Sequence, residues 1–342
     1  MRLCLFISAV LILSGCDFFQ KKPKLPDDRT LTFAFYNVEN LFDATDDPGL
    51  QDQEYLPGSI KNWSDKRYRK KISDLARVIK ELGGKELPEI VGLCEVENQR
   101  VLKDLVSDPN LVPGRFAIIH FEDRDPRGID LALIYRPEEF TPVTKRLVPV
   151  KRRSGGSYSR GILYVTGKSN NGEVFHIFVN HWPSREKDES SKEEGRMEMA
   201  AALRRLTDAL PDRGHSSNIV ILGDLNDEPD NTSLSKVLGA VPPGKPSPSG
   251  LVNLMYPPFD KGYGTVKFQR DWKMLDHVIV SEALLDGVGY RVEGSKGVVY
   301  SAYWMEFHMN NGEVSPDRTY LGEKYTGGPG DHFPVYCRMI RH

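Results

Sequence analysis

The chain has 342 residues, of which 39% are hydrophobic and 27% are charged, and its formal net charge is −2 at pH 7. This composition is typical of a globular protein and excludes a disordered or fibrous chain. The small net charge excludes a strong positive field over the whole surface, so any polyanionic partner would have to be met by local groups of basic residues.

The first part of the chain is a targeting segment. A basic start is followed by the apolar run Leu3 to Leu13, which is too short to span a bilayer, and then at once by Ser14-Gly15-Cys16. This pattern predicts a secretory signal peptide. Its end resembles the bacterial lipoprotein box, in which the cysteine is acylated and becomes the new first residue.

The predicted organisation follows from that segment. We expect residues 1–15 to be a lipoprotein signal peptide, residues 16–29 a tether, and residues 30–342 one domain. The mature protein would be a monomer exported from the cell and held by the lipid on Cys16 to a bacterial membrane, on its periplasmic or surface face.

Two cysteines remain in the predicted domain, Cys94 and Cys337. Both lie in apolar, strand-like runs, where a free cysteine behaves as a small hydrophobic residue. The sequence favours two buried thiols, although an exported protein could also pair them.

Hydrophobic patterning predicts more strands than helices. The expected strands are Leu31–Asn40, Glu89–Glu95, Arg115–Phe121 paired with Ile129–Tyr135, Arg160–Gly167 and Glu173–His181 joined by the turn Asn170-Asn171-Gly172, Ile219–Leu222, Lys273–Val280 and Phe333–Met339. The expected helices are Ser64–Gly84, Asn98–Val106 and Glu193–Leu210. The first helix should turn its basic residues Lys66, Arg67, Arg69, Lys70 and Lys71 toward solvent.

Polar side chains recur where these strands end. The strand Ile219–Leu222 is followed by Gly223-Asp224-Leu225-Asn226, and such residues alone would be ordinary turn formers. The recurring set is Asn37, Glu39, Glu95, His181, Asp224, Asn226, Asp276, Asp331 and His332. Several polar strand ends in one chain predict a shared site, and its carboxylates suit a hard cation such as Mg²⁺ or Mn²⁺.

Three other kinds of site are excluded by the motifs. The chain has no Cys/His spacing of the zinc type, no Gly-Lys-Ser/Thr phosphate loop and no Gly-x-Ser-x-Gly nucleophile turn.

The order of the polar motifs resembles the endonuclease/exonuclease/phosphatase superfamily, in its deoxyribonuclease-I-like form. The matching pieces are Asn37-Val38-Glu39, Cys94-Glu95, Asn180-His181-Trp182-Pro183-Ser184, Gly223-Asp224-Leu225-Asn226, Leu275-Asp276-His277 and Asp331-His332-Phe333-Pro334. The resemblance implies an α/β fold, a four-layered α-β-β-α sandwich with two mixed sheets packed face to face. It also implies metal-dependent cleavage of a phosphoester by an in-line water.

The resemblance also implies roles at the metal and the phosphate. Glu95 resembles the main metal ligand, with Glu39 and Asp331 as further ligands. Asn37 and Arg160 resemble groups that hold the substrate phosphate.

The remaining implied roles are catalytic. Asp224 resembles the group that orients or deprotonates the water, and Asn226 a hydrogen-bond donor to the phosphate. His332 resembles the imidazole of a His–Asp pair whose carboxylate is Asp276. His181 matches the second imidazole of the deoxyribonuclease-like branch, and Asp130 is the candidate carboxylate that orients it.

Three functions follow as hypotheses. The first is an endonuclease-like phosphodiesterase that uses Mg²⁺ or Mn²⁺ and acts on nucleic acid. The second is a phosphatase or a phospholipase of the sphingomyelinase kind; here the acidic pair Asp227-Glu228 would repel a highly phosphorylated ring. The third is a non-catalytic surface lipoprotein that serves as a binding module.

The substrate should depend on loops such as Gln51–Asn62 and Val241–Lys261. Trp182 could stack on a substrate ring or wedge between the two sheets.

Overall fold

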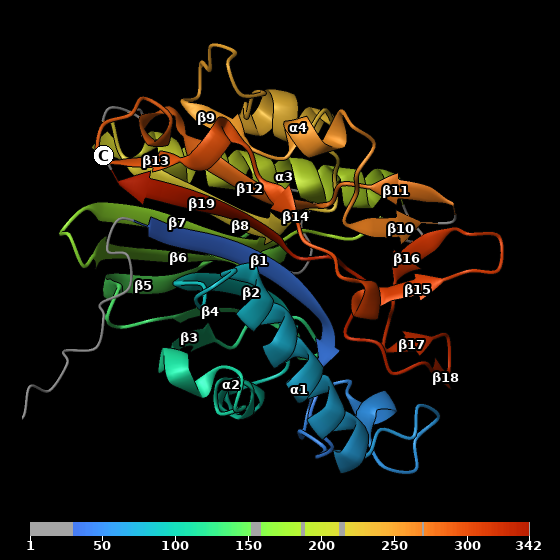
Figure 1. Ribbon diagram of the computed structural model, residues 1–342. Coiled ribbons are helices and arrows are strands. Elements are labelled where there is room, and N and C mark those ends of the chain that lie inside the picture. Colours follow the sequence, from blue (N-terminus) through green and yellow to red (C-terminus); the bar gives the residue numbers. More distant parts are fainter. Residues whose placement is uncertain (1–29, 152–158, 186–188, 212–215, 269, 342) are drawn as a thin grey trace, which may run out of the picture.

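The computed structural model describes residues 30–151, 159–185, 189–211, 216–268 and 270–341 (Figure 1). The predicted signal peptide, Cys16 and the tether lie outside these residues. Within the described part of the chain, no helix is both long enough and apolar enough to cross a membrane.

Two large mixed sheets form the centre of the molecule. The first sheet has the strand order β13-β19-β1-β2-β4-β3, with β14 also paired to β19. Its strands are β1 (Thr30–Leu41), β2 (Ile90–Val96), β3 (Ala117–Phe121), β4 (Asp130–Tyr135), β13 (Tyr290–Val292), β14 (Val298–Val299) and β19 (Val335–Arg341). Only β1 and β2 run parallel to each other among these described pairs.

The second sheet has the order β5-β6-β7-β8-β12-β9. Its strands are β5 (Phe140–Val150), β6 (Ser159–Ser169), β7 (Val174–His181), β8 (Asn218–Asp224), β9 (Leu251–Asn253) and β12 (Asp276–Ser281). The pair β7–β8 is parallel, and the predicted hairpin is present as β6–β7.

The two sheets pack face to face through one apolar core. Phe33 and Phe35 of β1 meet Phe175 of β7, and all three are fully buried. Burial of each such ring stabilises the fold by about 1.5–3 kcal/mol. Cys94 and Cys337 lie in the same core as free, buried thiols, as the sequence predicts.

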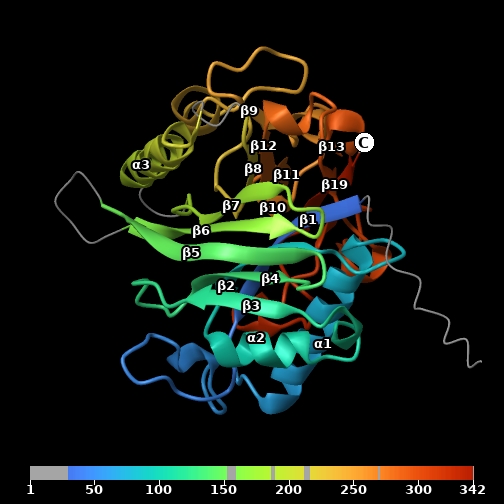
Figure 2. The same ribbon diagram turned by 90° about the vertical axis from the view of Figure 1, so that its left-hand side faces the viewer.

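Helices cover the outer face of each sheet, which completes four layers (Figure 2). The helices α1 (Asp65–Leu82) and α2 (Gln99–Val106) cover the first sheet, and α3 (Glu189–Asp208) covers the second together with the π-helical turn Ser233–Leu238. Ser64 caps α1 by accepting a hydrogen bond from the backbone of Arg67. The predicted α-β-β-α sandwich is confirmed.

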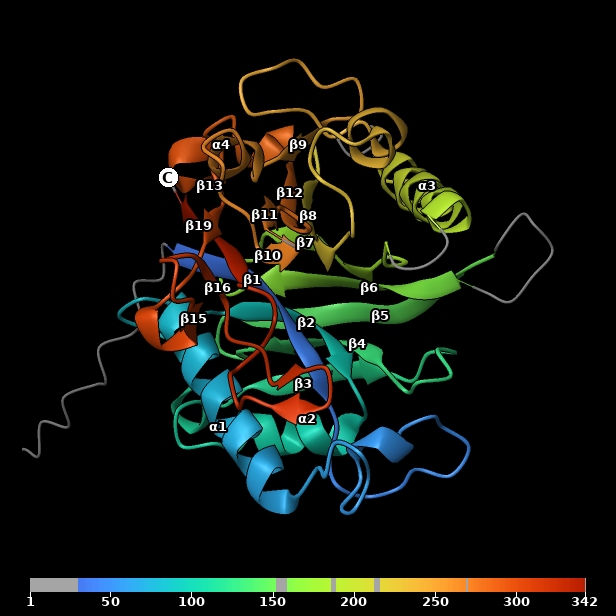
Figure 3. The same ribbon diagram turned by 90° about the vertical axis from the view of Figure 1, so that its right-hand side faces the viewer.

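The sequence did not predict several peripheral elements. The long strand β5 lies at the edge of the second sheet, and most of its side chains are exposed, so it lacks a clear apolar period. Other unpredicted elements include the short strands β9, β13 and β14, the short helix α4 (Tyr256–Phe259) and the hairpins β10–β11 (Val266–Phe268, Asp271–Lys273), β15–β16 (Glu306–His308, Val314–Pro316) and β17–β18 (Tyr320–Leu321, Lys324–Tyr325). The β10–β11 and β15–β16 hairpins lie next to each other (Figure 3).

Candidate functional site

The site is the polar end of the core between the sheets. Leu222 and Asp224 are two residues apart in β8, as are Val179 and His181 in β7, so each polar residue faces the same way as its apolar neighbour. The register places Asp224 of β8 between His181 of β7 and Asp276 of β12. All three polar side chains therefore point toward the first sheet.

Four residues around this end have left-handed backbone conformations. The φ angles are 47° at Glu39, 52° at Asn40, 63° at Glu95 and 52° at Asn226. A residue with a Cβ atom adopts this conformation at a cost of about 1–2 kcal/mol. Such strained residues concentrate at functional sites. Here they interrupt the alternation of side chains between the two faces of the sheet at the ends of β1 and β2.

Asn37 of β1 joins the two sheets at the centre of the site. Its amide nitrogen lies 3.2 Å from Glu95 Oε1 and donates to Asp224 Oδ2 at 3.1 Å. It also lies 3.5 Å from His332 Nε2. One carboxamide thus contacts the predicted metal ligand, the predicted water-orienting acid and the predicted imidazole.

His332 and Asp276 form a buried pair. The ring Nδ1 and Asp276 Oδ2 are 2.7 Å apart, and Nε2 lies 3.9 Å from Asp224 Oδ2. Burial alone would lower the pKa of His332, but the carboxylates of Asp276 and Asp224 raise it well above its ordinary value. The ring is therefore an imidazolium at neutral pH, and its Nε2–H faces the carboxylate of Asp224.

The second imidazole, His181, has the opposite preference. Its Nε2 lies 3.6 Å from Glu95 Oε1 and 3.7 Å from Asp224 Oδ2. Burial and then the nearby charges of Arg160 and Arg127 hold the pKa of His181 well below its ordinary value. A neutral ring and a charged ring on either side of one carboxylate is an arrangement suited to acid–base chemistry.

Asp224 lies between these rings and is 2% exposed. Burial raises the pKa of its carboxyl group to about 7, so the group can exchange a proton near neutral pH. Its Oδ1 accepts the backbone N–H of Asn226, whose side-chain amide donates to the carbonyl of Trp182.

Glu95 is the carboxylate that best fits a hard cation. Its side chain is 16% exposed, one oxygen accepts the backbone N–H of Asn40, and the other faces the space shared with His181. It lines a cavity of about 520 Å³ together with Asp224, Asp331 and His332. An accessible oxygen donor beside a second carboxylate fits Mg²⁺ or Mn²⁺.

The predicted ligands Glu39 and Asp331 do not cluster with Glu95. Among the described residues, two groups of three have ligand atoms within 4.8 Å of one another, and neither includes Glu39, Glu95 or Asp331. Glu39 is instead held by the backbone N–H groups of Thr319 and Tyr320. The group that does cluster near the cavity is Asp224, Asp276 and His332, whose ring Nδ1 is already hydrogen-bonded to Asp276.

Lys71 corrects the prediction that the basic face of the first helix is solvated. Its side chain is 1% exposed; Nζ donates to Pro329 O at 3.0 Å and lies 3.8 Å from Glu39 Oε2. Burial raises the pKa of Glu39 to about 7, with Asp331 adding to the rise and Lys71 opposing it. The burial of Lys71 could have been predicted from its position, because Leu75 and Val78 follow it at helical spacing and lie on the buried face of α1.

The cavity is bordered by five basic side chains: Arg127, Arg160, Arg185, Lys273 and Arg318. Arg160, the predicted phosphate ligand, is among them and also donates to Trp182 O at 3.0 Å. Phe268 of the β10–β11 hairpin lines the same cavity and is 59% exposed. The predicted loop Val241–Lys261 contributes no lining residue, whereas the β10–β11 hairpin, which sequence patterning missed, contributes Val266, Phe268 and Lys273.

Asp130 is placed away from His181. Its Oδ2 lies 3.0 Å from His120 Nε2, and its Oδ1 accepts the backbone N–H of Asp123. The prediction that Asp130 orients His181 is therefore wrong, because its two carboxylate oxygens are engaged by His120 and by the backbone of Asp123.

Two further interpretations change. Trp182 is fully buried in the core beneath α3 rather than between the sheets or in the cavity. Asp227 is buried and paired with Arg185 and Arg196, and Glu228 is paired with Lys273. The acidic pair is thus matched by cations, which removes the argument that it repels a phosphorylated ring.

Comparisons with known proteins agree with this geometry. Residues 32–341 match the model of the Endonuclease/Exonuclease/phosphatase family. No curated protein matches the chain at a significant level.

Solved structures share the fold at low sequence identity. A family protein from Bacteroides thetaiotaomicron is 18% identical with a TM-score of 0.58, over 92% of this chain and 98% of that one. A mannosyl-6-phosphatase of the same organism is 17% identical with a TM-score of 0.57, over 91% and 99%. D. rerio TDP2 complexed with a single-strand DNA product is 11% identical with a TM-score of 0.55, over 91% and 98%.

The family model covers nearly the whole described chain, and the polar strand ends that carry the family resemblance meet at one cavity. The chain belongs to the endonuclease/exonuclease/phosphatase family.

Proposed function

We propose that this protein is a divalent-metal-dependent phosphodiesterase of the endonuclease kind. The observation that carries the proposal is the pair of buried imidazoles with opposite protonation preferences on either side of Asp224. Hydrolysis of a phosphodiester needs one group that accepts a proton from the attacking water and another that stabilises the leaving oxygen.

Each side chain has a definite task in this proposal. Asp224 accepts a proton from water, because its pKa of about 7 allows exchange at neutral pH. His332, held as an imidazolium by Asp276, donates its Nε2–H to a phosphoryl oxygen. Asn37 orients Asp224 by donating to its Oδ2, and Arg160 adds positive charge at the cavity wall.

Glu95 is the residue that would hold Mg²⁺ or Mn²⁺, and such an ion supplies charge neutralisation for the phosphoryl oxygens and leaving group. Glu39 and Asp331 would not ligate the ion directly but would attract it through their negative charge.

Supercoiled plasmid and a short DNA duplex, each incubated with Mg²⁺, test the proposal. We expect cleavage by the wild type, and a loss of at least about 100-fold in Glu95→Gln and in His332→Ala. His308→Ala is the matched control, since that imidazole is exposed outside the cavity. Cleavage that survives both site substitutions would contradict the assignment.

A phosphatase is the second candidate. The five basic side chains around a cavity of limited size suit a terminal phosphate, and the acidic pair that seemed to oppose one is neutralised. A similar fold belongs to a mannosyl-6-phosphatase. Release of inorganic phosphate from mannose 6-phosphate, with no cleavage of DNA, would favour this activity over the first; release of phosphocholine would indicate the phospholipase alternative.

We also propose that the protein is exported and anchored through Cys16, on the strength of the N-terminal sequence. Labelled palmitate should enter the wild type in growing cells and should not enter Cys16→Ala. Equal labelling of both would exclude this anchor.

A further inference from the structure

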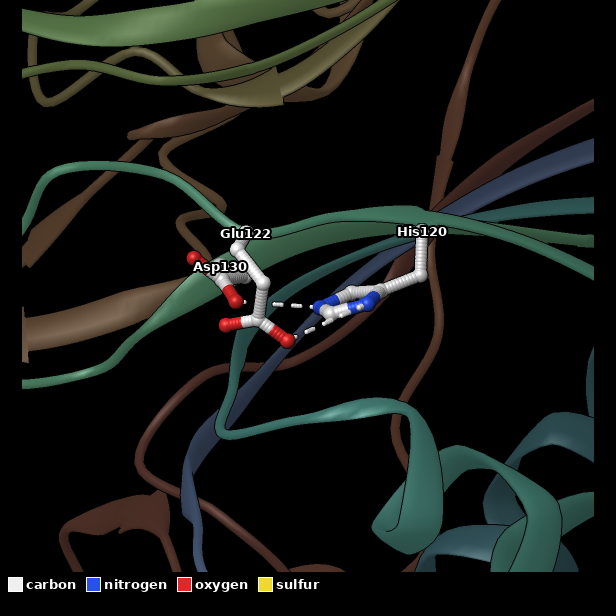
Figure 4. Close-up of side chains that lie close together, drawn as sticks. All are labelled: His120, Glu122 and Asp130. Carbon is white, nitrogen blue, oxygen red and sulfur yellow. Dashed lines mark hydrogen bonds and ion pairs between the residues drawn. The ribbon is translucent and has the colours of Figure 1, made fainter. Parts of the chain in front are cut away.

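A second group of metal-ligating side chains lies on the β3–β4 connection, outside the cavity. His120 is near the end of β3, Glu122 follows the strand, and Asp130 begins β4 (Figure 4). One ligand atom from each residue lies within 4.8 Å of the others. The side chains of His120 and Asp130 are 4% and 2% exposed, whereas that of Glu122 is 68% exposed.

The distances suit coordination as well as a hydrogen bond. His120 Nε2 and Asp130 Oδ2 are 3.0 Å apart. Two ligands that each lie about 2.0–2.1 Å from a tetrahedral zinc ion are about 3.3–3.4 Å apart, so the pair would open by a few tenths of an ångström. Glu122 Oε1 lies 3.9 Å from the other ring nitrogen, Nδ1, so its carboxylate would have to turn toward Nε2 to share an ion held there.

The electrostatics of the group favour a shared cation. Asp130 is buried beside Glu122, and Asp123 and Asp47 add further negative charge nearby. Two carboxylates brought together in this way repel each other unless a proton or a metal ion lies between them.

We propose that His120, Glu122 and Asp130 bind a transition-metal ion of the zinc class, at a site separate from the phosphoesterase centre. One imidazole and two carboxylates form a donor set that favours Zn²⁺ over Mg²⁺, because Mg²⁺ prefers oxygen ligands alone. The buried histidine and aspartate form a fixed pair, and the exposed glutamate closes the site from solvent.

A metal ion at this site would affect the cavity, because the loop 122–128 connects the two. Asp130 holds the backbone of Asp123, and Asp123 Oδ2 accepts the N–H of Gly161 in the second sheet at 2.6 Å. Further along the loop, Asp125 pairs with Arg127 at 2.8 Å and Arg160 at 3.3 Å, and both arginines line the cavity. The ion would therefore fix the loop that positions two basic side chains; this consequence, unlike the site itself, rests on the proposed function.

The test is zinc binding by the full chain, measured by equilibrium dialysis in excess Mg²⁺ so that oxygen-only sites are filled. We expect the wild type to retain one more equivalent of Zn²⁺ than His120→Gln, and Glu122→Gln to bind that equivalent at least about tenfold more weakly. Co²⁺ in place of Zn²⁺ should give a visible absorption band that both variants lose.

The controls separate this site from folding and from catalysis. His308→Gln removes an imidazole that lies 3.2 Å from Glu306 on the surface, and it should leave the stoichiometry unchanged. Glu122 is exposed, so its substitution should leave the metal-free fold intact. Equal Zn²⁺ binding and equal Co²⁺ spectra in the wild type and Glu122→Gln would overturn the proposal, whatever the result of the DNA assay.

Discussion

At the scale of single residues, the Asp276–His332 pair decides the protonation of the site. Asp276 is fully buried, one of its oxygens contacts His332 Nδ1, and the other has no hydrogen-bond partner in the described structure. The carboxylate therefore acts chiefly by its charge on the neighbouring ring.

Asp276→Asn should lower kcat by about 100-fold or more and shift its pH dependence. Burial already lowers the pKa of His332, and removal of the opposing carboxylate lets that pKa fall. Because the ring is needed as an imidazolium, the alkaline decline of kcat moves to lower pH. Steady-state rates between pH 5 and 10 measure the shift, with the exposed Asp260→Asn as control; an unchanged alkaline limb would exclude this role for the carboxylate.

Glu97 is a buried carboxyl group whose charge is opposed by its surroundings. It is 1% exposed, Oε2 accepts the backbone N–H of Asp43, and Oε1 has no partner in the described residues. Burial, and then the charges of Asp43, Asp47 and Asp52, raise the pKa of Glu97 from 4.5 to about 8.

Glu97→Gln should therefore stabilise the protein at alkaline pH. The contribution of Glu97 to stability is fully present below pH 4.5 and is lost as the pH rises through about 8. A glutamine keeps the acceptor for Asp43 and does not ionise. Urea unfolding should show a gain of about 3 kcal/mol at pH 9 and little change at pH 5, whereas exposed Glu86→Gln should change neither value. A loss of stability at pH 9 would contradict the assignment.

At the scale of elements, α1 does more than cover the first sheet. It carries the buried Lys71 to Glu39, Thr319 and Pro329, and so ties the helix to the loop before β19. A buried cation of this kind is costly to remove, because its partners remain without a donor.

Lys71→Met should lower the free energy of unfolding by about 3 kcal/mol. The substitution keeps the length of the side chain but leaves the Glu39 carboxylate and the Pro329 carbonyl without the ammonium group. Lys66→Met, on the exposed face of the same helix, should remain within about 0.5 kcal/mol of the wild type. Denaturant titration distinguishes the two, and equal stabilities would show that the buried contact contributes nothing.

The β10–β11 hairpin supplies an exposed ring to the cavity. Phe268→Ala should raise KM for a single-stranded oligonucleotide about fivefold or more while kcat changes little, because stacking of an unpaired base on an aromatic ring contributes about 1–3 kcal/mol to binding. KM for a small phosphodiester without a base should not change. Phe307→Ala is the matched control, an exposed ring outside this cavity; equal effects of both variants on KM would exclude Phe268 as a substrate contact.

The sequence predicts those elements whose pattern is local. An apolar strand and its polar end are adjacent in the chain, so Asn37, His181, Asp224 and Asp276 could all be placed at strand ends before the fold was known. The edge strand β5 and the short hairpins carry no such pattern, since their side chains are largely exposed.

Contacts between distant elements were the part that could not be predicted. The spacing of Asp130 gives no sign that it meets His120 across β3–β4, and nothing local marks Lys71 as the partner of Glu39, 32 positions away. Both depend on the packing of layers, and the left-handed conformations at Glu39 and Glu95 further redirect side chains that simple alternation would place elsewhere.

At the scale of the whole molecule, the site exists only while the two sheets keep their spacing. Asn37 and Glu95 belong to the first sheet, whereas His181, Asp224 and Asp276 belong to the second. The distances of 3.1 Å between Asn37 and Asp224 and 3.6 Å between Glu95 and His181 are therefore distances across the core. A change in the distance between the sheets near this end should therefore change the distances between the site residues and lower kcat.

Gly92 of β2 is the position at which to make that change. A Cβ atom there would lie 3.2 Å from Val179, 3.3 Å from Leu222 and 3.3 Å from Phe35, and the first two residues precede His181 and Asp224 by two positions. Gly92→Val should force the sheets apart, lowering stability by about 1–3 kcal/mol and kcat by about tenfold or more at a temperature where the protein stays folded.

Leu75→Ala is the control that separates a loss of stability from a change in the spacing of the two sheets. It removes a buried side chain between α1 and the first sheet and should cost at least as much stability, about 2–5 kcal/mol, without altering kcat. Circular dichroism melts and single-turnover rates on the same samples provide the comparison. If Gly92→Val lowered kcat no more than Leu75→Ala does, activity would not depend on the spacing between the two sheets.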